Sequence, residues 1–110
     1  MRLPGDAVIA RDKLTRYLLV PQVRGDKSAF LARAGYSLSN ADLLLRDLRS
    51  QILPREPRML ESNEFGQYYE IRGTLTGPAK VRLPVRTIWM AEHLSGRTKF
   101  ITLIPDKERI

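Results

Sequence analysis

The hydrophobic period of this chain changes at residues 54–57, where the segment Pro54-Arg55-Glu56-Pro57 interrupts it. Before this segment, apolar residues recur at helical spacing, and beyond it they alternate with polar residues as in half-buried strands. Helices followed by strands predict an α+β domain, with N-terminal helices packed on a curved antiparallel sheet of about four strands. The 110 residues support one domain, 1–110, with a helical part at 1–53 and a sheet part at 58–110.

Three helices are predicted before the change of period. The first stops before Pro21, and the second runs from an N-cap at Asp26 to a C-terminal Gly35. The third begins at Ser39 or Asn40 and ends before Pro54. The apolar residues expected on the buried sides of these helices are Leu14, Tyr17, Leu18, Phe30, Leu31, Ala34, Leu44, Leu45, Leu48 and Ile52.

The strands are predicted from alternation. Residues 68–75 and 81–89 form two long strands, and Pro84 marks the second as an edge strand or the site of a bulge. The last strand, 99–104, is apolar enough to be central. A fourth strand has a weak candidate in residues 59–61.

The charge of the chain favours a polyanionic partner. Nineteen Lys and Arg against twelve Asp and Glu give a formal charge of +7 and a pI near 10.2. Residues 1–55 carry ten basic and five acidic side chains, so most of the excess lies in the helical part. Nucleic acid is the first expected partner and an anionic membrane surface the second. A solvated basic surface that only maintains solubility is the alternative.

Several functional classes are excluded by what the sequence lacks. Without cysteine the chain has no disulfide scaffold, thiolate zinc site or cysteine nucleophile. The single histidine, His93, is expected in a loop, and the acidic residues lack metal-ligand spacing, so we expect neither a metal nor a cofactor. Apolar runs are too short to span a membrane, and the N-terminus lacks the core of a signal peptide. We therefore expect a cytoplasmic domain with no membrane association.

Polar residues on the predicted strands suit metal-free RNA cleavage. This reaction needs a base for the ribose 2′-hydroxyl, cations for the phosphorane and a donor for the leaving 5′-oxygen. Side chains of the required types are Glu70, Arg72, Arg86, Thr87, Lys99 and Thr102. Among the strand residues, Tyr68, Arg72 and Lys99 are predicted to bind RNA, with Tyr68 stacking on a base. The alternative is a sheet whose solvent face simply alternates polar residues.

Motifs along nearly the whole chain resemble an uncharacterised bacterial domain family. Members of this family occur alone and as C-terminal toxin domains of filamentous-haemagglutinin-type contact-dependent growth inhibition proteins. The matching segments are Leu3-Pro4-Gly5-Asp6-Ala7-Val8-Ile9, Tyr17-Leu18-Leu19-Val20-Pro21, Gly25-Asp26-Lys27-Ser28-Ala29-Phe30, Ser39-Asn40-Ala41-Asp42-Leu43, Phe65-Gly66-Gln67-Tyr68-Tyr69, Leu75-Thr76-Gly77-Pro78 and Val85-Arg86-Thr87-Ile88-Trp89.

The resemblance implies the ribonuclease superfold shared by barnase, EndoU, colicin D and RelE. It also implies a metal-independent ribonuclease without a cofactor, with tRNA as one candidate substrate, and an acidic immunity protein or antitoxin as a partner. The catalytic residues that it implies by position are Lys27, Tyr69, Arg86, Thr87 and Thr102.

The sequence departs from the toxin pattern in ways that keep other functions open. Val20 stands where the toxins usually have Asn, and Tyr68 and Arg72 occupy positions that tend to be Arg and Asp. One alternative is a non-catalytic basic module that binds RNA or an acidic partner protein. Another is an inactive standalone relative of the toxin domains. A third reading is a subunit that works only in an oligomer, joined through the Pro84 strand or Met59-Leu60.

Overall fold

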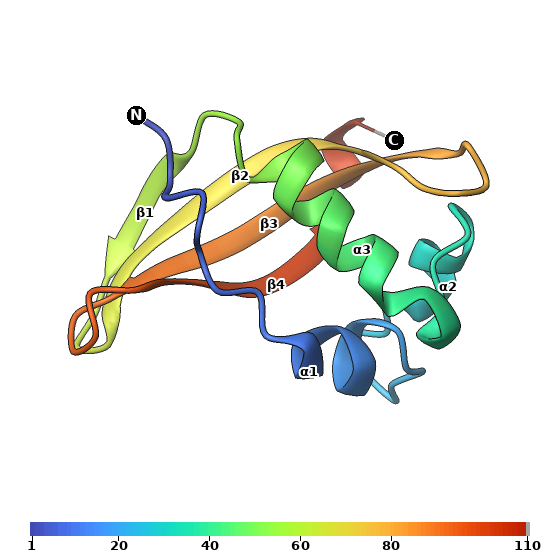
Figure 1. The fold of residues 1–110 in the computed structure, drawn as a ribbon, viewed down its shortest axis with the longest axis horizontal. Helices are drawn as coiled ribbons and strands as arrows, with labels where there is room; N and C mark the ends of the chain where they lie inside the picture. The colour runs from blue at the N-terminus through green and yellow to red at the C-terminus, as the bar shows by residue number, and fades with distance from the viewer. Residues whose placement is uncertain (110) are drawn as a thin grey trace.

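The computed structural model describes residues 1–109, which form one four-stranded antiparallel sheet preceded by short helices (Figure 1). The helical segments, with η for 3-10 and π-helical turns, are α1 (Arg11–Lys13), η1 (Leu14–Leu18), α2 (Ser28–Ala32), η2 (Leu38–Asn40), α3 (Ala41–Asp47), η3 (Leu48–Ile52) and η4 (Lys107–Arg109). The strands are β1 (Arg58–Ser62), β2 (Gly66–Thr76), β3 (Arg82–Glu92) and β4 (Thr98–Pro105). Their order in the sheet, β1-β2-β3-β4, follows the chain. The predicted α+β class is confirmed, and the weak strand candidate at 59–61 lies within β1.

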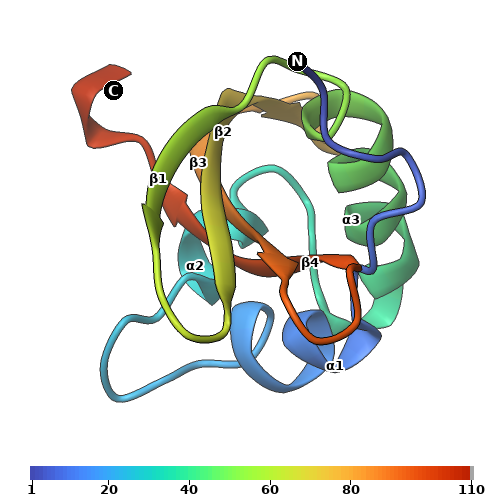
Figure 2. The ribbon, with the colours of Figure 1, turned by 90° about the vertical axis from the view of Figure 1, so that its left-hand side faces the viewer.

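The sheet curves around α3, which lies on its concave side (Figure 1 and Figure 2). One hydrophobic core joins this inner face to the helices. Its members include Leu14, Leu31, Leu44, Leu48 and Ile52 from the helical part and Ile71, Leu83, Val85, Trp89 and Leu103 from the strands. Trp89 packs edge to face against Phe100, with ring centroids 5.2 Å apart. The opposite face of the sheet, called the outer face below, is left free for charged side chains.

The helix ends follow local signals in the sequence. Ser37 and Asn40 form a reciprocal capping box, in which the Ser37 N–H donates to Asn40 Oδ1 at 2.8 Å. Ser37 therefore caps the 3-10 turn η2, whereas α3 has its N-cap position at Asn40, one of the two predicted starts. Gly35 has a φ of +92°, as expected for the residue that ends a helix. Tyr17, predicted on a buried stripe, is instead 61% exposed because it borders an open pocket beside β4.

β4 lies at an edge of the sheet, so the prediction that this strand is central is wrong. Its side chains Phe100 and Leu103 are buried through the inner face alone, and β3 is its only neighbouring strand in the described part of the chain. The outer edge of β4 is partly covered by the N-terminal segment, through a parallel bridge between Val8 and Lys99. There the Val8 N–H donates to Thr98 O at 2.7 Å, and the Phe100 N–H donates to Val8 O at 2.8 Å.

Pro84 does not mark an edge strand, because β3 pairs with both β2 and β4. Pro84 lies opposite Thr74 of β2, just before the β3–β4 ladder begins at the pair Val85–Pro105. Its carbonyl accepts from the Asp106 N–H at 2.9 Å. The N and O of one residue point to the same side of an antiparallel strand, so an N–H at Pro84 would also point toward the β4 side. Because β4 has ended there, the sheet loses no ladder hydrogen bond to the proline.

Candidate nucleic-acid interface on the outer face

Strand register decides which of the predicted residues share the outer face. Arg72 of β2 lies opposite Arg86 of β3, and Glu70 shares their face because side chains alternate along a strand. Ile88, the partner of Glu70, lies in turn opposite Thr102 of β4. The outer face therefore carries polar groups on three strands, with Glu70 and Arg72 on β2, Arg86 on β3 and Thr102 on β4.

A buried carboxylate held by three arginines lies at the centre of this face. The Glu70 side chain is 2% exposed. Its Oε2 accepts from Arg86 Nε at 2.7 Å, and Arg86 Nη2 lies 2.5 Å from the same oxygen. Its Oε1 lies 3.3 Å from Arg58 Nη2 and 3.3 Å from Arg72 Nε. Together with Glu108, these residues are called the Glu70 cluster below.

Glu108 brings the C-terminal turn η4 onto the cluster. Arg72 Nη1 donates to Glu108 Oε2 at 3.0 Å, and this hydrogen bond is the main reason that the pKa of Arg72 is raised. Arg109 fastens the same turn to β2 by donating to Thr74 Oγ1 at 2.7 Å. The cluster holds three guanidinium groups against two carboxylates, and Glu56, which is paired with Arg2, adds a third carboxylate to the lining of the cavity above it.

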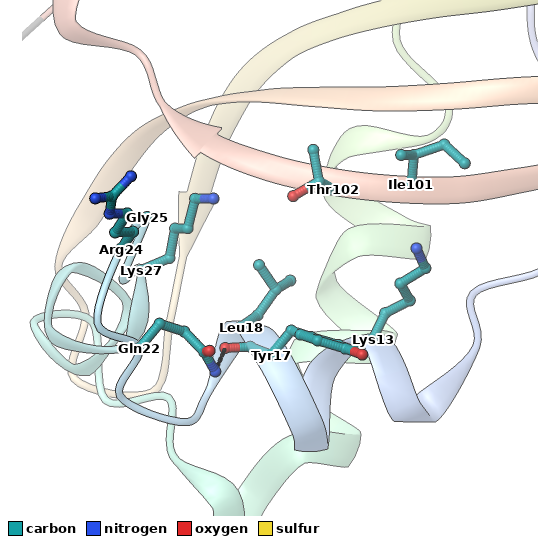
Figure 3. Close-up of a pocket in the computed structure, with 9 residues that line it drawn as sticks. All are labelled: Lys13, Tyr17, Leu18, Gln22, Arg24, Gly25, Lys27, Ile101 and Thr102. Carbon is teal, nitrogen blue, oxygen red and sulfur yellow. Dashed lines mark hydrogen bonds between the residues drawn. The ribbon is translucent and has the colours of Figure 1, made fainter.

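Three open cavities meet along the outer face and the β4 edge. The first, of about 570 Å³, lies over the Glu70 cluster. The second, of about 560 Å³, shares Arg86 and Glu108 with the first and extends to Gly25 and Lys27. The third, of about 390 Å³, shares Gly25 and Lys27 with the second (Figure 3). Neighbouring cavities thus share lining residues, and the three together are called the outer groove below.

Lys27 links the predicted residues of the groove. It precedes α2 and borders both the second cavity, with Arg86, and the third cavity, with Thr102. In Figure 3 the Lys27 ammonium group points toward Thr102, while Lys13 enters the third cavity from the other side. The structure thus brings Lys27, Arg86, Thr102 and Arg72 to a single groove.

Tyr68 and Lys99 lie on the outer face but away from the groove. They lie opposite the same residue of β3, Met90, from β2 and β4 respectively. Lys99 Nζ donates to Glu92 Oε2 at 3.0 Å. This bond and the hydrogen bond from the Ser95 hydroxyl, which contributes more, lower the pKa of Glu92. The three cavities of the groove are lined by neither Tyr68 nor Lys99.

Tyr69 and Thr87 are not brought to the groove, because they lie on the inner face. Tyr69 belongs to the hydrophobic core. Thr87 is fully buried, and its Oγ1 donates to Ile71 O at 2.9 Å and accepts from Trp89 Nε1 at 2.7 Å. Alternation along β2 and β3 turns both side chains away from Arg86, so neither reaches an RNA bound on the outer face.

Two buried carboxylates of the groove, Glu70 and Asp106, were not among the predicted catalytic or RNA-binding residues. Glu70 was one of several polar strand residues of suitable type, and nothing local distinguishes it. Only the register of β2 with β1 and β3 reveals it as the centre of the cluster. Asp106 follows β4 and borders the second cavity. Both of its oxygens are buried without a hydrogen bond from the described residues, and Arg109 Nε lies 3.6 Å from Oδ2.

A family model matches residues 4–107, which is nearly the whole chain. The chain belongs to the DUF6883 family. This family is described as a domain of unknown function, so the expected membership of an uncharacterised family is confirmed while the chemistry stays open. No curated protein and no solved structure matches the DUF6883 chain.

Two further findings concern residues 1–109. None of their helices is long and apolar enough to cross a membrane. Within the same range, no group of three or more His, Cys, Asp or Glu side chains is placed to hold a metal ion. His93 lies in the turn after β3, as predicted; it is exposed, and its Nε2 lies 3.2 Å from Asn63 O.

Proposed function

We propose that this domain is a metal-independent ribonuclease whose reaction takes place at the Glu70 cluster. The observation that carries the proposal is the Glu70 carboxylate itself, which is held by three guanidinium groups at the floor of an open groove. A carboxylate is an acceptor-only group that can take a proton from a ribose hydroxyl. Guanidinium groups match the charge and geometry of a phosphate.

In the proposed reaction Glu70 takes the proton of the ribose 2′-hydroxyl, and the 2′-oxygen attacks the adjacent phosphorus. The bond from phosphorus to the 5′-oxygen breaks, leaving a 2′,3′-cyclic phosphate and a 5′-hydroxyl. Arg86 and Arg72 stabilise the charge of the phosphorane, because their guanidinium groups adjoin the carboxylate. Lys27, farther along the groove, donates the proton that the 5′-oxygen requires.

The wider features of the chain agree with an RNA substrate. The net charge of +7 favours a polyanion, and the order of helices followed by a four-stranded antiparallel sheet matches the layout expected of the ribonuclease toxins. We propose tRNA as the first substrate to test. An acidic immunity protein or antitoxin that covers the outer groove would complete the toxin system.

The proposal is tested with purified protein and labelled RNA in the presence of EDTA. Wild-type protein should cleave and leave 2′,3′-cyclic ends. Glu70→Gln removes the base at constant shape and should lower the rate by about 10²–10⁴-fold. Glu61→Gln is the matched control, because Glu61 is an exposed glutamate of β1. Cleavage by Glu70→Gln at the wild-type rate would contradict the role of Glu70.

A second candidate function is RNA binding without cleavage. It is favoured by the contact of two Arg86 nitrogens with Glu70. The same contact would hold the arginine in place to bind a phosphate. A binding module leaves the RNA intact, and its affinity falls with added salt as phosphate contacts are screened. Intact RNA together with salt-dependent binding selects this function over the ribonuclease.

A further inference from the structure

The third cavity of the outer groove has a lining unlike that of the first. It is called the Tyr17 pocket below, and its lining residues are Lys13, Tyr17, Leu18, Gln22, Arg24, Gly25, Lys27, Ile101 and Thr102 (Figure 3). Three of them are cationic and none is acidic. Lys13, Arg24 and Lys27 form no ion pair with any residue between 1 and 109, whereas the neighbouring Arg11 is paired with Asp42. The pocket therefore collects positive charge that the described chain does not neutralise.

The nearest acidic side chain of the loop is already occupied. Asp26 accepts from the Ser28 hydroxyl at 2.7 Å and from the Ser28 N–H at 3.0 Å. Both hydrogen bonds lower the pKa of Asp26, and the bond from the Ser28 hydroxyl has the larger effect. Asp26 borders the second cavity, which Lys27 also lines, but not the Tyr17 pocket, and it forms no ion pair with Lys13 or Lys27 within residues 1–109.

The same pocket offers surfaces for a base. Tyr17 is exposed, and Leu18 and Ile101 add apolar surface. Gln22 holds the loop that follows η1, because its side-chain amide donates to Tyr17 O at 3.4 Å and to Val20 O at 3.2 Å. An aromatic ring beside cations is the combination that binds single-stranded nucleic acid, through base stacking and phosphate charge. The volume of about 390 Å³ falls within the range of small-ligand sites.

We propose that the Tyr17 pocket binds one nucleotide of the RNA strand beyond the two that flank the scissile phosphate, with its phosphate at Lys13 and Arg24 and its base against Tyr17. This inference rests on the proposed function, because it makes the pocket a subsite of the same groove. The pocket shares Gly25 and Lys27 with the second cavity, and the second cavity shares Arg86 with the Glu70 cluster. A strand that passes over the cluster can therefore continue into the pocket.

Substrate length provides the kinetic test. A dinucleotide provides only the two nucleotides that flank the scissile phosphate, whereas a hexanucleotide extends into the pocket. Lys13→Gln and Tyr17→Ala should each lower kcat/KM for the hexanucleotide about tenfold, the size of one phosphate or stacking contact. Both variants should cleave the dinucleotide at the wild-type rate. Arg16→Gln is the control, because Arg16 is an exposed cation of the same turn, η1, outside the pocket lining. Equal losses on both substrates would overturn the subsite.

Binding provides a test that does not depend on cleavage. The probe is a fluorescent 2′-O-methyl hexanucleotide, whose blocked 2′-oxygen prevents the reaction, and the readout is anisotropy with wild-type and variant chains. Lys13→Gln should raise Kd about tenfold and reduce the slope of log K against log salt by about 0.7. If wild-type protein cleaves no RNA but the pocket variants still lose affinity, the ribonuclease proposal fails and the pocket stands.

Two binding results would overturn the pocket itself. One is wild-type affinity for the hexanucleotide in both Lys13→Gln and Tyr17→Ala, with circular dichroism confirming that the variants are folded. The other is equally tight binding of adenosine 5′-monophosphate, which would make the pocket a site for a free nucleotide and not part of an RNA-binding path.

Discussion

Arg86 and Glu70 are joined across β2 and β3 by two nitrogens of one guanidinium group that meet the same carboxylate oxygen. Arg86 Nε lies 2.7 Å from Glu70 Oε2, and Nη2 lies 2.5 Å from it. This arrangement fixes the plane of the guanidinium group, while the Arg86 side chain stays 31% exposed toward the groove. The third nitrogen, Nη1, makes no hydrogen bond within residues 1–109. It is therefore free for a phosphate while the other two hold the Glu70 carboxylate.

Removing the carboxylate should cost more stability than removing one of its partners. Glu70→Ala leaves three arginines facing one another, and because all three are partly exposed we expect a loss of about 1–3 kcal/mol, below the usual cost of breaking a buried pair. Arg58→Ala leaves Glu70 with two arginines and should cost less than about 1 kcal/mol. Urea unfolding at neutral pH measures both, and the reverse order would contradict the central position of Glu70.

Thr87 should prove structural. Thr87→Val preserves the shape of the side chain but leaves Trp89 Nε1–H without its buried acceptor, which should cost about 1–3 kcal/mol. RNA affinity and cleavage by the folded variant should match the wild type, because Thr87 lies on the inner face. The measurements are urea unfolding and kcat/KM under conditions in which the variant is folded. A large loss of kcat without a loss of stability would restore a catalytic role.

Local patterns in the sequence were sufficient for the architecture. The change of period at 54–57 separated the helices from the strands, because apolar residues recur every three or four positions in a helix and every two positions in a strand. Gly35 was identifiable as a helix end since few other residues tolerate positive φ. The alternation also placed Thr87 beside Val85 on the apolar face of β3. Thr87 was selected against that pattern, first as a polar strand residue of suitable type and then through the family resemblance.

The candidate site could not be predicted from local sequence patterns, because it depends on contacts between distant parts of the chain. Glu70 gains its importance from Arg58 and Arg86, which a periodic pattern cannot assign to it without the strand register. Lys27 reaches the groove because its loop folds back beside β4. The edge position of β4 was missed for a related reason, since one buried face is enough to make a strand apolar.

Gly77 should not tolerate a side chain. A Cβ at this position would overlap the carbonyl oxygen of Ala34 and lie 2.8 Å from the Ala34 Cβ. The contact is tight because the turn after β2 is tied to the end of the α2 segment, where the Ala79 N–H donates to Ala34 O at 2.9 Å. We expect Gly77→Ala to lower the free energy of unfolding by about 1–3 kcal/mol, as overpacking usually does.

Gly5→Ala is the control for this substitution, because a Cβ at Gly5 would meet nothing within 4 Å. Both variants are compared with the wild type by urea unfolding. If Gly77→Ala is as stable as Gly5→Ala, the turn is not held against Ala34 as tightly as the structure indicates.

The buried pair Tyr36–Asp47 should make the protein sensitive to alkaline pH. The Tyr36 hydroxyl donates to Asp47 Oδ2 at 2.6 Å. Burial is the main cause, and this hydrogen bond the second, of a pKa of Tyr36 that lies well above its ordinary value of 10.0. The stabilisation that the Tyr36 hydroxyl gives to the folded state is fully present below pH 10. It is lost as the pH rises above 10, because the unfolded chain then releases a proton that the folded chain retains. The free energy of unfolding should fall above pH 10 by up to about 1.4 kcal/mol per pH unit.

Tyr36→Phe isolates this contribution. The variant should be less stable than the wild type at pH 7, because Asp47 loses a buried hydrogen-bond donor, at a cost of about 1–2 kcal/mol. Its stability should then decline less steeply between pH 10 and pH 11.5, so that the two curves converge. Urea unfolding across this range measures both effects, with Tyr17→Phe, a change at an exposed tyrosine, as the control. Parallel decline of Tyr36→Phe and wild type would show that another group causes the alkaline loss.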